Sequence, residues 1–238
     1  MEKVKTFIQG LDELIEGGFI PCSTILLAGK TGTGKSSFCT SYLYYGALNS
    51  EPGIYVTTEE SPNDIKDDAQ AVFGWSLEEL ERRGLIRILP IKPEFPSQSI
   101  IDKSKILKIY IYDLVDQIAE LVREINAKRV VIDSISVLEL FIKDRFLGRV
   151  AMNYFIDSLK ELKVTSILTT TIPENEEILS NLGIIEYLVD GIIKLDYIPV
   201  TEEFKRTLTI RKIRRINHST YIHPFEITSE GIKITSLY

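Results

Sequence analysis

Cysteine is nearly absent from this sequence. Only Cys22 and Cys39 occur among 238 residues. One precedes the first predicted core strand and the other lies inside the helix predicted to follow it, so we do not expect a disulfide framework. The pattern is typical of a reduced, cytoplasmic protein.

Long apolar runs are also missing. The first five residues, Met1 to Lys5, lack the apolar region of a signal peptide. No later apolar run approaches the roughly 20 residues that a membrane span needs. We therefore expect a soluble protein.

The sequence has no excess of positive charge. Its 28 lysines and arginines are outnumbered by 34 aspartates and glutamates, which gives a net charge of −6. This balance argues against a protein that coats nucleic acid or anionic membranes by bulk electrostatics, so any such binding must be local. The 44% hydrophobic content can fill a three-layer core, and we expect one domain over residues 1–238.

The residue types of one stretch match those that a specific chemistry requires. Residues Gly29 to Ser36, with the sequence GKTGTGKS, fit the phosphate-binding pattern G-x-x-x-x-G-K-[ST]. The apolar run 24–28 before it predicts a buried strand, and residues 37–48 after it predict a helix. Glycines let successive N–H groups point into one concavity, and the helix adds the positive end of its dipole. The stretch therefore predicts a site for a polyphosphate.

Two residues of this loop have a specific expected role. Lys35 would reach the β and γ phosphates as a point charge, and the Ser36 hydroxyl would take one position on Mg²⁺. The residues that we predict to bind the nucleotide are Thr31, Gly32, Thr33, Gly34, Lys35, Ser36 and Ser37.

The rest of the chain indicates an α/β fold. Apolar runs alternate with amphipathic stretches through the first two thirds, and the last third consists of strands. The expected strands are 54–58, 85–91, 129–134, 164–171, 191–197, 206–213, 222–228 and 232–237, and the expected helices are 62–73, 108–126 and 146–162. We predict an α/β fold with a mainly parallel central sheet, helices on both faces and antiparallel C-terminal strands. The proline-interrupted stretch 92–105 suggests a mobile loop, and the connection 173–177 is acidic.

Three carboxylates fall at the predicted carboxyl ends of strands, where ligands bind in such sheets. Asp133 ends an apolar run, so we predict that it holds Mg²⁺ through water opposite Ser36, although a helix cap is the other interpretation. Glu59 and Glu60 follow the second predicted strand. Hydrolysis needs one carboxylate to orient or deprotonate water, and Glu60 could instead be a helix-dipole partner, so spacing does not rank the two.

The segment from Phe204 to His218 carries six basic residues and no acidic one. It could be a solvated strand face, a phosphate-contacting patch for DNA or RNA, or a source of charge for another subunit. In the third interpretation Lys212 and Arg214, two apart in a strand, point together at the γ-phosphate of a neighbouring subunit's nucleotide. Spacing alone does not decide between these.

The order of these motifs resembles the KaiC-like branch of the RecA superfamily, especially its archaeal single-domain members. The resemblance covers nearly the whole chain. It rests on the phosphate loop together with the stretches 10–14 (GLDEL), 57–62 (TTEESP), 130–134 (VVIDS), 186–191 (EYLVDG) and 212–214 (KIR).

The resemblance implies a RecA-like fold of the P-loop NTPase class. It also implies slow hydrolysis of Mg-ATP at sites shared between the subunits of a hexameric ring. It assigns hydrolysis to Glu59 and Glu60, and action across the subunit interface to Lys212 and Arg214. Residues that it implies to line the neighbour's nucleotide are Ile213, His218 and Thr228. It also implies a regulatory or assembly ATPase with a protein partner that the sequence does not identify.

Two features separate this chain from the circadian clock member of that branch. The chain has one ATPase repeat, and the stretch 184–187 lacks the clock protein's Ser-Thr phosphoacceptors, so clock-type autophosphorylation is not implied. Two other functions stay open. A DNA-binding ATPase similar to recombinases and RadA paralogues is disfavoured by the acidic connection 173–177, where recombinases place a DNA-binding loop. An ATP-dependent assembly scaffold without hydrolysis is disfavoured by the paired glutamates.

Overall fold

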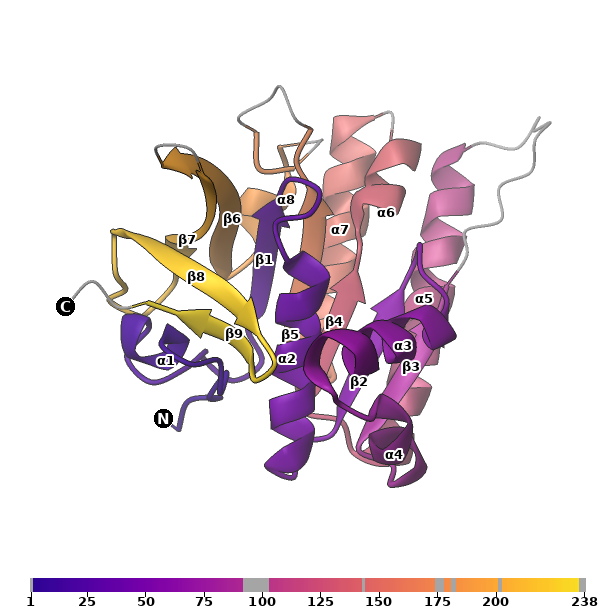
Figure 1. The fold of residues 1–238 in the computed structure, drawn as a ribbon. Coiled ribbons are helices and arrows are strands. Elements are labelled where there is room, and N and C mark those ends of the chain that lie inside the picture. The colour runs from indigo at the N-terminus through magenta and orange to yellow at the C-terminus, as the bar shows by residue number, and fades with distance from the viewer. Residues whose placement is uncertain are drawn as a thin grey trace.

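The structure, a computed structural model, describes residues 2–91, 103–142, 144–173, 178–180, 183–200 and 203–235. Most of the predicted mobile loop 92–105 and of the acidic connection 173–177 lies outside these residues. The described chain folds around a nine-stranded sheet with the order β3-β2-β4-β5-β1-β6-β7-β8-β9. Figure 1 shows the sheet running through the molecule with helices on both sides.

The first half of the sheet is parallel. Its strands are short and rich in buried aliphatic residues because both faces are covered by helices. They are β1 (Thr24–Gly29), β2 (Gly53–Thr57), β3 (Ile86–Pro90), β4 (Arg129–Asp133) and β5 (Thr165–Thr171). Strand β6 (Gly191–Val200) joins β1 in the same direction. The chain then turns back on itself through three antiparallel strands, β7 (Glu203–Ile213), β8 (Ile222–Thr228) and β9 (Gly231–Ile234). The predicted fold class is confirmed.

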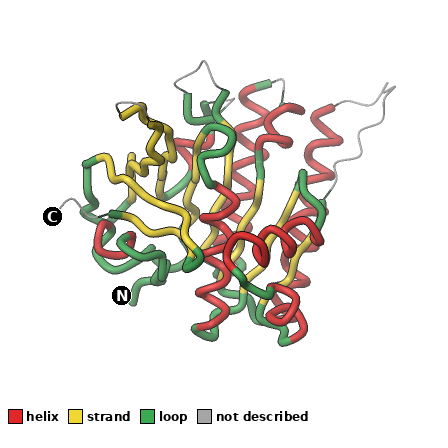
Figure 2. The backbone as a smooth tube through the Cα atoms, viewed as in Figure 1, coloured by secondary structure: helices red, strands yellow, loops and turns green. Residues whose placement is uncertain are grey.

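Alternation along the strands divides the core into two layers, because successive side chains point to opposite faces of a sheet. Leu27 and Tyr55 pack on one face and Leu26 and Ile54 on the other. The first face is covered by α1 (Leu11–Leu14), α2 (Lys35–Leu48), α3 (Pro62–Phe73) and α4 (Leu77–Arg82). The second is covered by α5 (Lys103–Ile125), α6 (Ser136–Phe141), α7 (Arg145–Glu161) and α8 (Ile185–Leu188). Figure 2 shows these helices in red against the yellow strands.

The helix boundaries agree with the sequence where a cap marks them. Ser61 caps α3 by accepting a hydrogen bond from the Asp64 N–H, and Pro62 takes the first helical position as predicted. The sequence analysis did not predict α4 and α6, because six residues each are too few for a helical period to show. Helix α5 begins at Lys103, earlier than predicted. Within the described residues, no helix has both the length and the apolar character needed to cross a membrane.

One arginine is fully enclosed by the first core layer. The side chain of Arg129 has 0% relative exposure, and it forms an ion pair with Glu51 in which Nε lies 2.8 Å from Oε2. Its guanidinium also donates to the carbonyls of Tyr42, at 2.9 Å, and Lys5, at 2.7 Å. Helix α2 passes so close that a Cβ on Gly46 would lie 2.4 Å from Arg129 Nε. The arginine therefore joins the N-terminal segment, α2 and β4.

Replacing this arginine should cost much more stability than replacing an exposed one. We expect Arg129→Ala to lower the free energy of unfolding by about 3–5 kcal/mol, because it leaves buried carbonyls without a donor. Arg82→Ala is the control, since Arg82 pairs with Glu79 at the surface, and it should cost about 0–1 kcal/mol. Denaturation by guanidinium chloride measures both. Equal losses of unfolding free energy in the two variants would contradict a larger contribution from the buried pair.

Candidate functional site

The predicted phosphate loop connects β1 to α2, the context that its chemistry requires. Gly32 and Gly34 adopt positive φ angles of 78° and 102°, which side chains other than glycine rarely reach. Gly34 stands at the helix N-cap position, so α2 begins at Lys35, two residues earlier than predicted. The Lys35 ammonium donates to the carbonyls of Gly29, at 2.8 Å, and Lys30, at 2.9 Å. Burial lowers the pKa of Lys35, against an opposing effect of Asp133.

A cavity of about 390 Å³ opens beside this loop. It lies at the carboxyl ends of the parallel strands, since Thr57 and Asp133 pair at the ends of β2 and β4. Residues from the loop and from the predicted acidic positions share its wall, which includes Thr31, Gly32, Gly34, Lys35, Ser36, Ser37, Glu59, Glu60 and Asp133. Thr33 is buried, and its hydroxyl donates to the Lys30 carbonyl at 2.8 Å.

The Asp133 carboxylate is held by three hydroxyl groups. Ser36 donates to Oδ2 at 2.8 Å, Tyr55 donates to Oδ2 at 2.6 Å, and Thr169 donates to Oδ1 at 2.5 Å. Burial, and next the charge of Asp133, raise the pKa of Tyr55 well above its ordinary value, so the phenol stays a donor. The structure thus brings together the two residues predicted to serve a metal.

The donor set at this point suits Mg²⁺ that shares its ligands with a polyphosphate. Among the described residues, no three or more His, Cys, Asp or Glu side chains come together as a metal site. Ser36 and Asp133 alone would leave most of an octahedral shell to phosphate oxygens and water, which is how Mg²⁺ is bound in nucleotide sites. The residues present therefore fit the predicted Mg-ATP.

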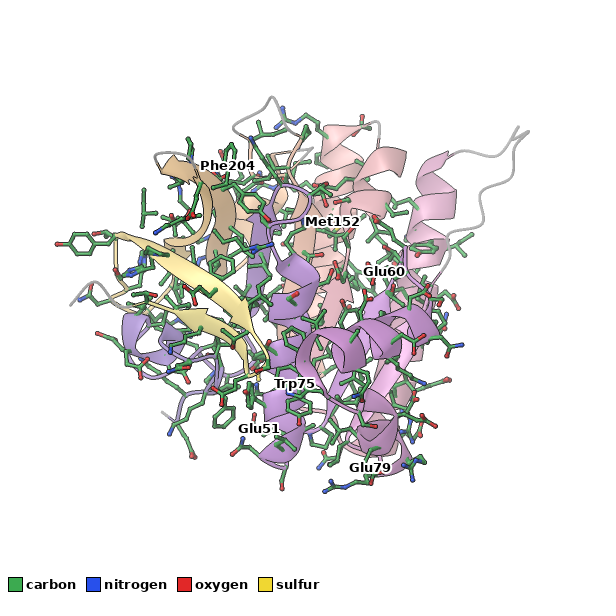
Figure 3. All side chains as sticks on the ribbon, in the orientation of Figure 1. Glu51, Glu60, Trp75, Glu79, Met152 and Phe204 are labelled. Carbon is green, nitrogen blue, oxygen red and sulfur yellow. The ribbon has the colours of Figure 1, made fainter. Side chains whose placement is uncertain are left out.

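Glu59 and Glu60 follow β2 directly and both reach the cavity. The Ser134 hydroxyl donates to Glu59 Oε1 at 3.2 Å, whereas Glu60 is fixed through its backbone, whose N–H donates to Thr57 Oγ1 at 3.1 Å. Burial, and next the charge of Asp133, raise the pKa of Glu60. Figure 3 labels Glu60 at the end of the sheet away from Glu79.

Four residues of the wall were missed by the sequence analysis: Ser134, Thr171, Arg206 and Ile227. Thr171 could have been predicted, because it is the last residue of a predicted strand. In the structure it pairs with Gly29. Arg206 and Ile227 come from the antiparallel strands β7 and β8, whose position over the loop depends on pairing that local patterns do not encode. The Arg206 guanidinium lies 5.2 Å from the centre of the Tyr197 ring.

Lys212 and Arg214 lie away from the chain's own loop. Lys212 pairs with Ile192, which pairs with Leu26 in the middle of β1, whereas the loop follows the end of that strand. The Lys212 ammonium donates to the carbonyls of Glu186, at 3.0 Å, and Val189, at 2.7 Å. Arg214 donates to the Tyr187 carbonyl at 3.2 Å. The basic segment is therefore split, with Arg206 in the cavity and Lys212 and Arg214 beside α8.

The remaining predicted residues are spread over both regions. Ile213 neighbours Lys212, but its side chain is buried in the core and is not exposed to a ligand. The half-buried His218 lies in the turn after β7, with Nδ1 2.9 Å from the Ser219 carbonyl oxygen. Thr228 ends β8 next to Ile227, and its hydroxyl donates to the Gly231 carbonyl at 3.1 Å. Thr228 thus follows a residue of the cavity wall and lies on a different strand from Lys212.

Comparison with known proteins gives a consistent result. Residues 4–237 match the family described as "ATPase: KaiC". A UPF0273 protein of Aeropyrum pernix is 36% identical over 238 residues, which cover 98% of this chain and 93% of that protein. The circadian clock oscillator protein KaiC of a Nostoc species is 33% identical over 240 residues, which cover 100% of this chain and 45% of that protein. The crystal structure of a KaiC-like protein from Pyrococcus horikoshii is 38% identical, with a TM-score of 0.84 and 99% of each chain covered.

The environment of Glu60 predicts a pH-dependent effect on stability. A carboxyl whose pKa is raised by folding binds protons more tightly in the folded state, so stability is lost as the pH rises through that pKa. We therefore expect Glu60→Gln to raise the free energy of unfolding at pH 7, and this gain to vanish by about pH 3, well below the pKa of about 4.3 of an unfolded glutamate, where the carboxyl is protonated in both states. Urea denaturation over this pH range measures the gain, and Glu120→Gln on the exposed side of α5 controls for the lowered net charge. A gain that persists unchanged at acid pH would contradict the expectation.

Proposed function

This chain belongs to the KaiC-like family of ATPases, and from that membership we propose that it binds Mg-ATP and hydrolyses it slowly at sites shared between the subunits of a ring. The observation that carries the proposal is the cavity in which Lys35, the pair Ser36 and Asp133, and the two glutamates meet. A phosphate cradle, a metal position and a base are the parts that phosphoryl transfer to water requires. We further propose that the whole chain, residues 1–238, acts as one cytoplasmic ATPase domain.

The residues of the loop bind and orient the phosphates. Backbone N–H groups at the start of α2 face the cavity, where the helix dipole favours negative charge. Lys35 is tethered to the Gly29 and Lys30 carbonyls and can turn toward phosphate oxygens with little loss of hydrogen bonding. Ser36 and Asp133 would hold Mg²⁺, which when bound neutralises charge on the phosphate oxygens.

One of the two glutamates orients the attacking water. Glu60 has the property of a base, because its raised pKa brings proton affinity closer to the operating pH. Glu59 has the better fixed carboxylate, because Ser134 donates to it. Both reach the cavity, so the choice between them stays open.

A second subunit supplies the charge that the cavity lacks. Arg206 is a cation of the chain's own cavity. Lys212 and Arg214 stand beside α8, where Lys212 is level with Leu26 in the middle of β1 and the Arg214 N–H donates to the Asp190 carbonyl. Both side chains donate to backbone carbonyls at α8, and neither is among the residues of the cavity wall, so we propose that Lys212 and Arg214 act on the neighbour's nucleotide. Head-to-tail contacts of this kind close into rings when the rotation permits, and we expect a hexamer, with an open filament as the second possibility.

Nucleic acid is not part of the proposal. The net charge is −6, and the basic residues of segment 204–218 do not form one surface, because Arg206 lines the cavity and Lys212 donates to backbone carbonyls. Phosphate-tracking proteins need a continuous positive stripe. A regulatory or assembly ATPase is the function that these features favour.

Binding and hydrolysis should be separable by mutation. We expect the double variant Glu59→Gln, Glu60→Gln to bind Mg-ATP within about threefold of the parent and to release phosphate at least about 100-fold more slowly, because a water-orienting base acts mainly in the transition state. Lys35→Ala, which removes the ammonium from the phosphate cradle, should lose measurable binding. Calorimetry and a phosphate-release assay measure the two quantities. Parent-like hydrolysis by the double variant would make the two carboxylates structural.

A further inference from the structure

We propose that Tyr197 is a positioning residue of this site, which fixes the phosphate loop from behind and aims Arg206 into the cavity. The inference rests on the proposed function and extends it to β6, a strand that carries no residue of the predicted site. Tyr197 contacts both partners through different parts of one side chain, the hydroxyl and the ring.

The hydroxyl of Tyr197 holds the loop. It donates to the Gly32 carbonyl at 2.7 Å. That carbonyl and the Thr33 N–H belong to one planar trans peptide, so they point in opposite directions. Loop N–H groups can face a phosphate only when their carbonyls face outward. The bond from Tyr197 to the outer side of the loop therefore sets the direction of the Thr33 N–H.

The peptide between Gly32 and Thr33 needs a contact from outside the loop to fix its orientation. Gly32 has a positive φ of 78° and no side chain, so its own preferences leave the peptide plane free to rotate. The bond from the Thr33 N–H to the Lys30 carbonyl is long, at 3.4 Å, and can be exchanged for a phosphate oxygen at low cost. The hydrogen bond from Tyr197 is short by comparison, and it comes from a strand that is anchored in the sheet.

The ring of Tyr197 supports Arg206. The two residues face each other across β6 and β7, with the guanidinium 5.2 Å from the ring centre. Phe204 packs edge-on against the same ring, with 6.5 Å between the two ring centres. This contact restricts rotation of the phenol. Figure 3 labels Phe204 at the top of the view, on the hairpin that β6 and β7 form.

Arg206 has an unused donor in this position. Its Nε is buried and has no hydrogen-bond partner among the described residues. A buried donor without an acceptor is costly, and an anionic oxygen in the adjoining cavity would relieve that cost. Stacking on Tyr197 keeps the guanidinium facing the cavity, because an arginine without such support loses more rotational freedom when it binds.

Two substitutions separate the roles of hydroxyl and ring. Tyr197→Phe removes the bond to Gly32 and keeps the ring, so we expect it to weaken Mg-ATP binding by about threefold to tenfold, the equivalent of one hydrogen bond. Tyr197→Ala removes both supports and should weaken binding several-fold more. Tyr112→Phe, at an exposed tyrosine of α5 outside the cavity, is the matched control and should bind like the parent. Calorimetric titration with Mg-ATP measures all of them.

Double variants with Arg206→Ala give a reading that a merely structural tyrosine would not produce. With Tyr197→Phe the losses in affinity should multiply, because the ring still supports Arg206. With Tyr197→Ala the combined loss should be smaller than the product, since part of the effect of Tyr197→Ala is already the loss of Arg206. In the absence of nucleotide, Tyr197→Phe should melt within about 2 °C of the parent, because an exposed hydrogen bond contributes little to global stability.

The outcomes distinguish this inference from the function on which it rests. Mg-ATP binding by the parent that is lost in Lys35→Ala, together with the weakening expected for Tyr197→Phe, supports both. Normal binding by the parent and by Tyr197→Phe overturns the role of Tyr197 alone, and so do losses that multiply equally in both double variants. A parent that does not bind Mg-ATP overturns the proposed function and the inference with it.

Discussion

The carboxylate of Asp133 is the point at which the sheet and the phosphate loop are joined. Hydroxyls from α2, β2 and β5 converge on it through Ser36, Tyr55 and Thr169. Asp133 is half-buried at the wall of the cavity, and the three short bonds to one carboxylate hold these elements in fixed relative positions. The same constraint places the Ser36 hydroxyl at the mouth of the loop, where the first turn of α2 presents its N–H groups. Structural stability and the geometry of the candidate site thus depend on one set of bonds.

Much of this site could be predicted because it lies at the carboxyl ends of neighbouring parallel strands. Glu59, Asp133 and the loop each follow an apolar run that is visible in the sequence, and a parallel sheet brings such ends together. Arg206 and Tyr197 could not be predicted in the same way. Their place over the loop comes from antiparallel pairing of β6 with β7, which includes a register shift at Ile192 and Ile193, and no local period encodes it. Helices α4 and α6 escaped prediction because one or two turns give too little periodicity.

Charged side chains gather in two separate regions of the molecule. The cavity gathers carboxylates, Lys35 and Arg206, whereas Lys212 and Arg214 are held by backbone carbonyls beside α8. Asp190 ties this second region to the start of β1, since it accepts from the Thr24 N–H at 3.0 Å and pairs with Lys160 at 2.9 Å. Lys212 lies in β7. Arg214 is the first residue of the turn after β7, not a strand residue, and its N–H is tied to the Asp190 carbonyl at 2.8 Å. Such preorganisation is what a charge donated to another subunit's transition state requires.

Complementation between two inactive variants tests most directly whether one site is built from two subunits. Arg214→Ala lacks the donated cation, and the double variant Glu59→Gln, Glu60→Gln lacks the base, yet each keeps the part that the other has lost. In an equal mixture that reassembles at random, about a quarter of the interfaces would pair an intact base with an intact arginine. Phosphate release by the mixture should therefore rise well above that of either variant alone. A mixture that releases phosphate no faster than the average of its two components, although both variants assemble and bind Mg-ATP, would contradict the shared site.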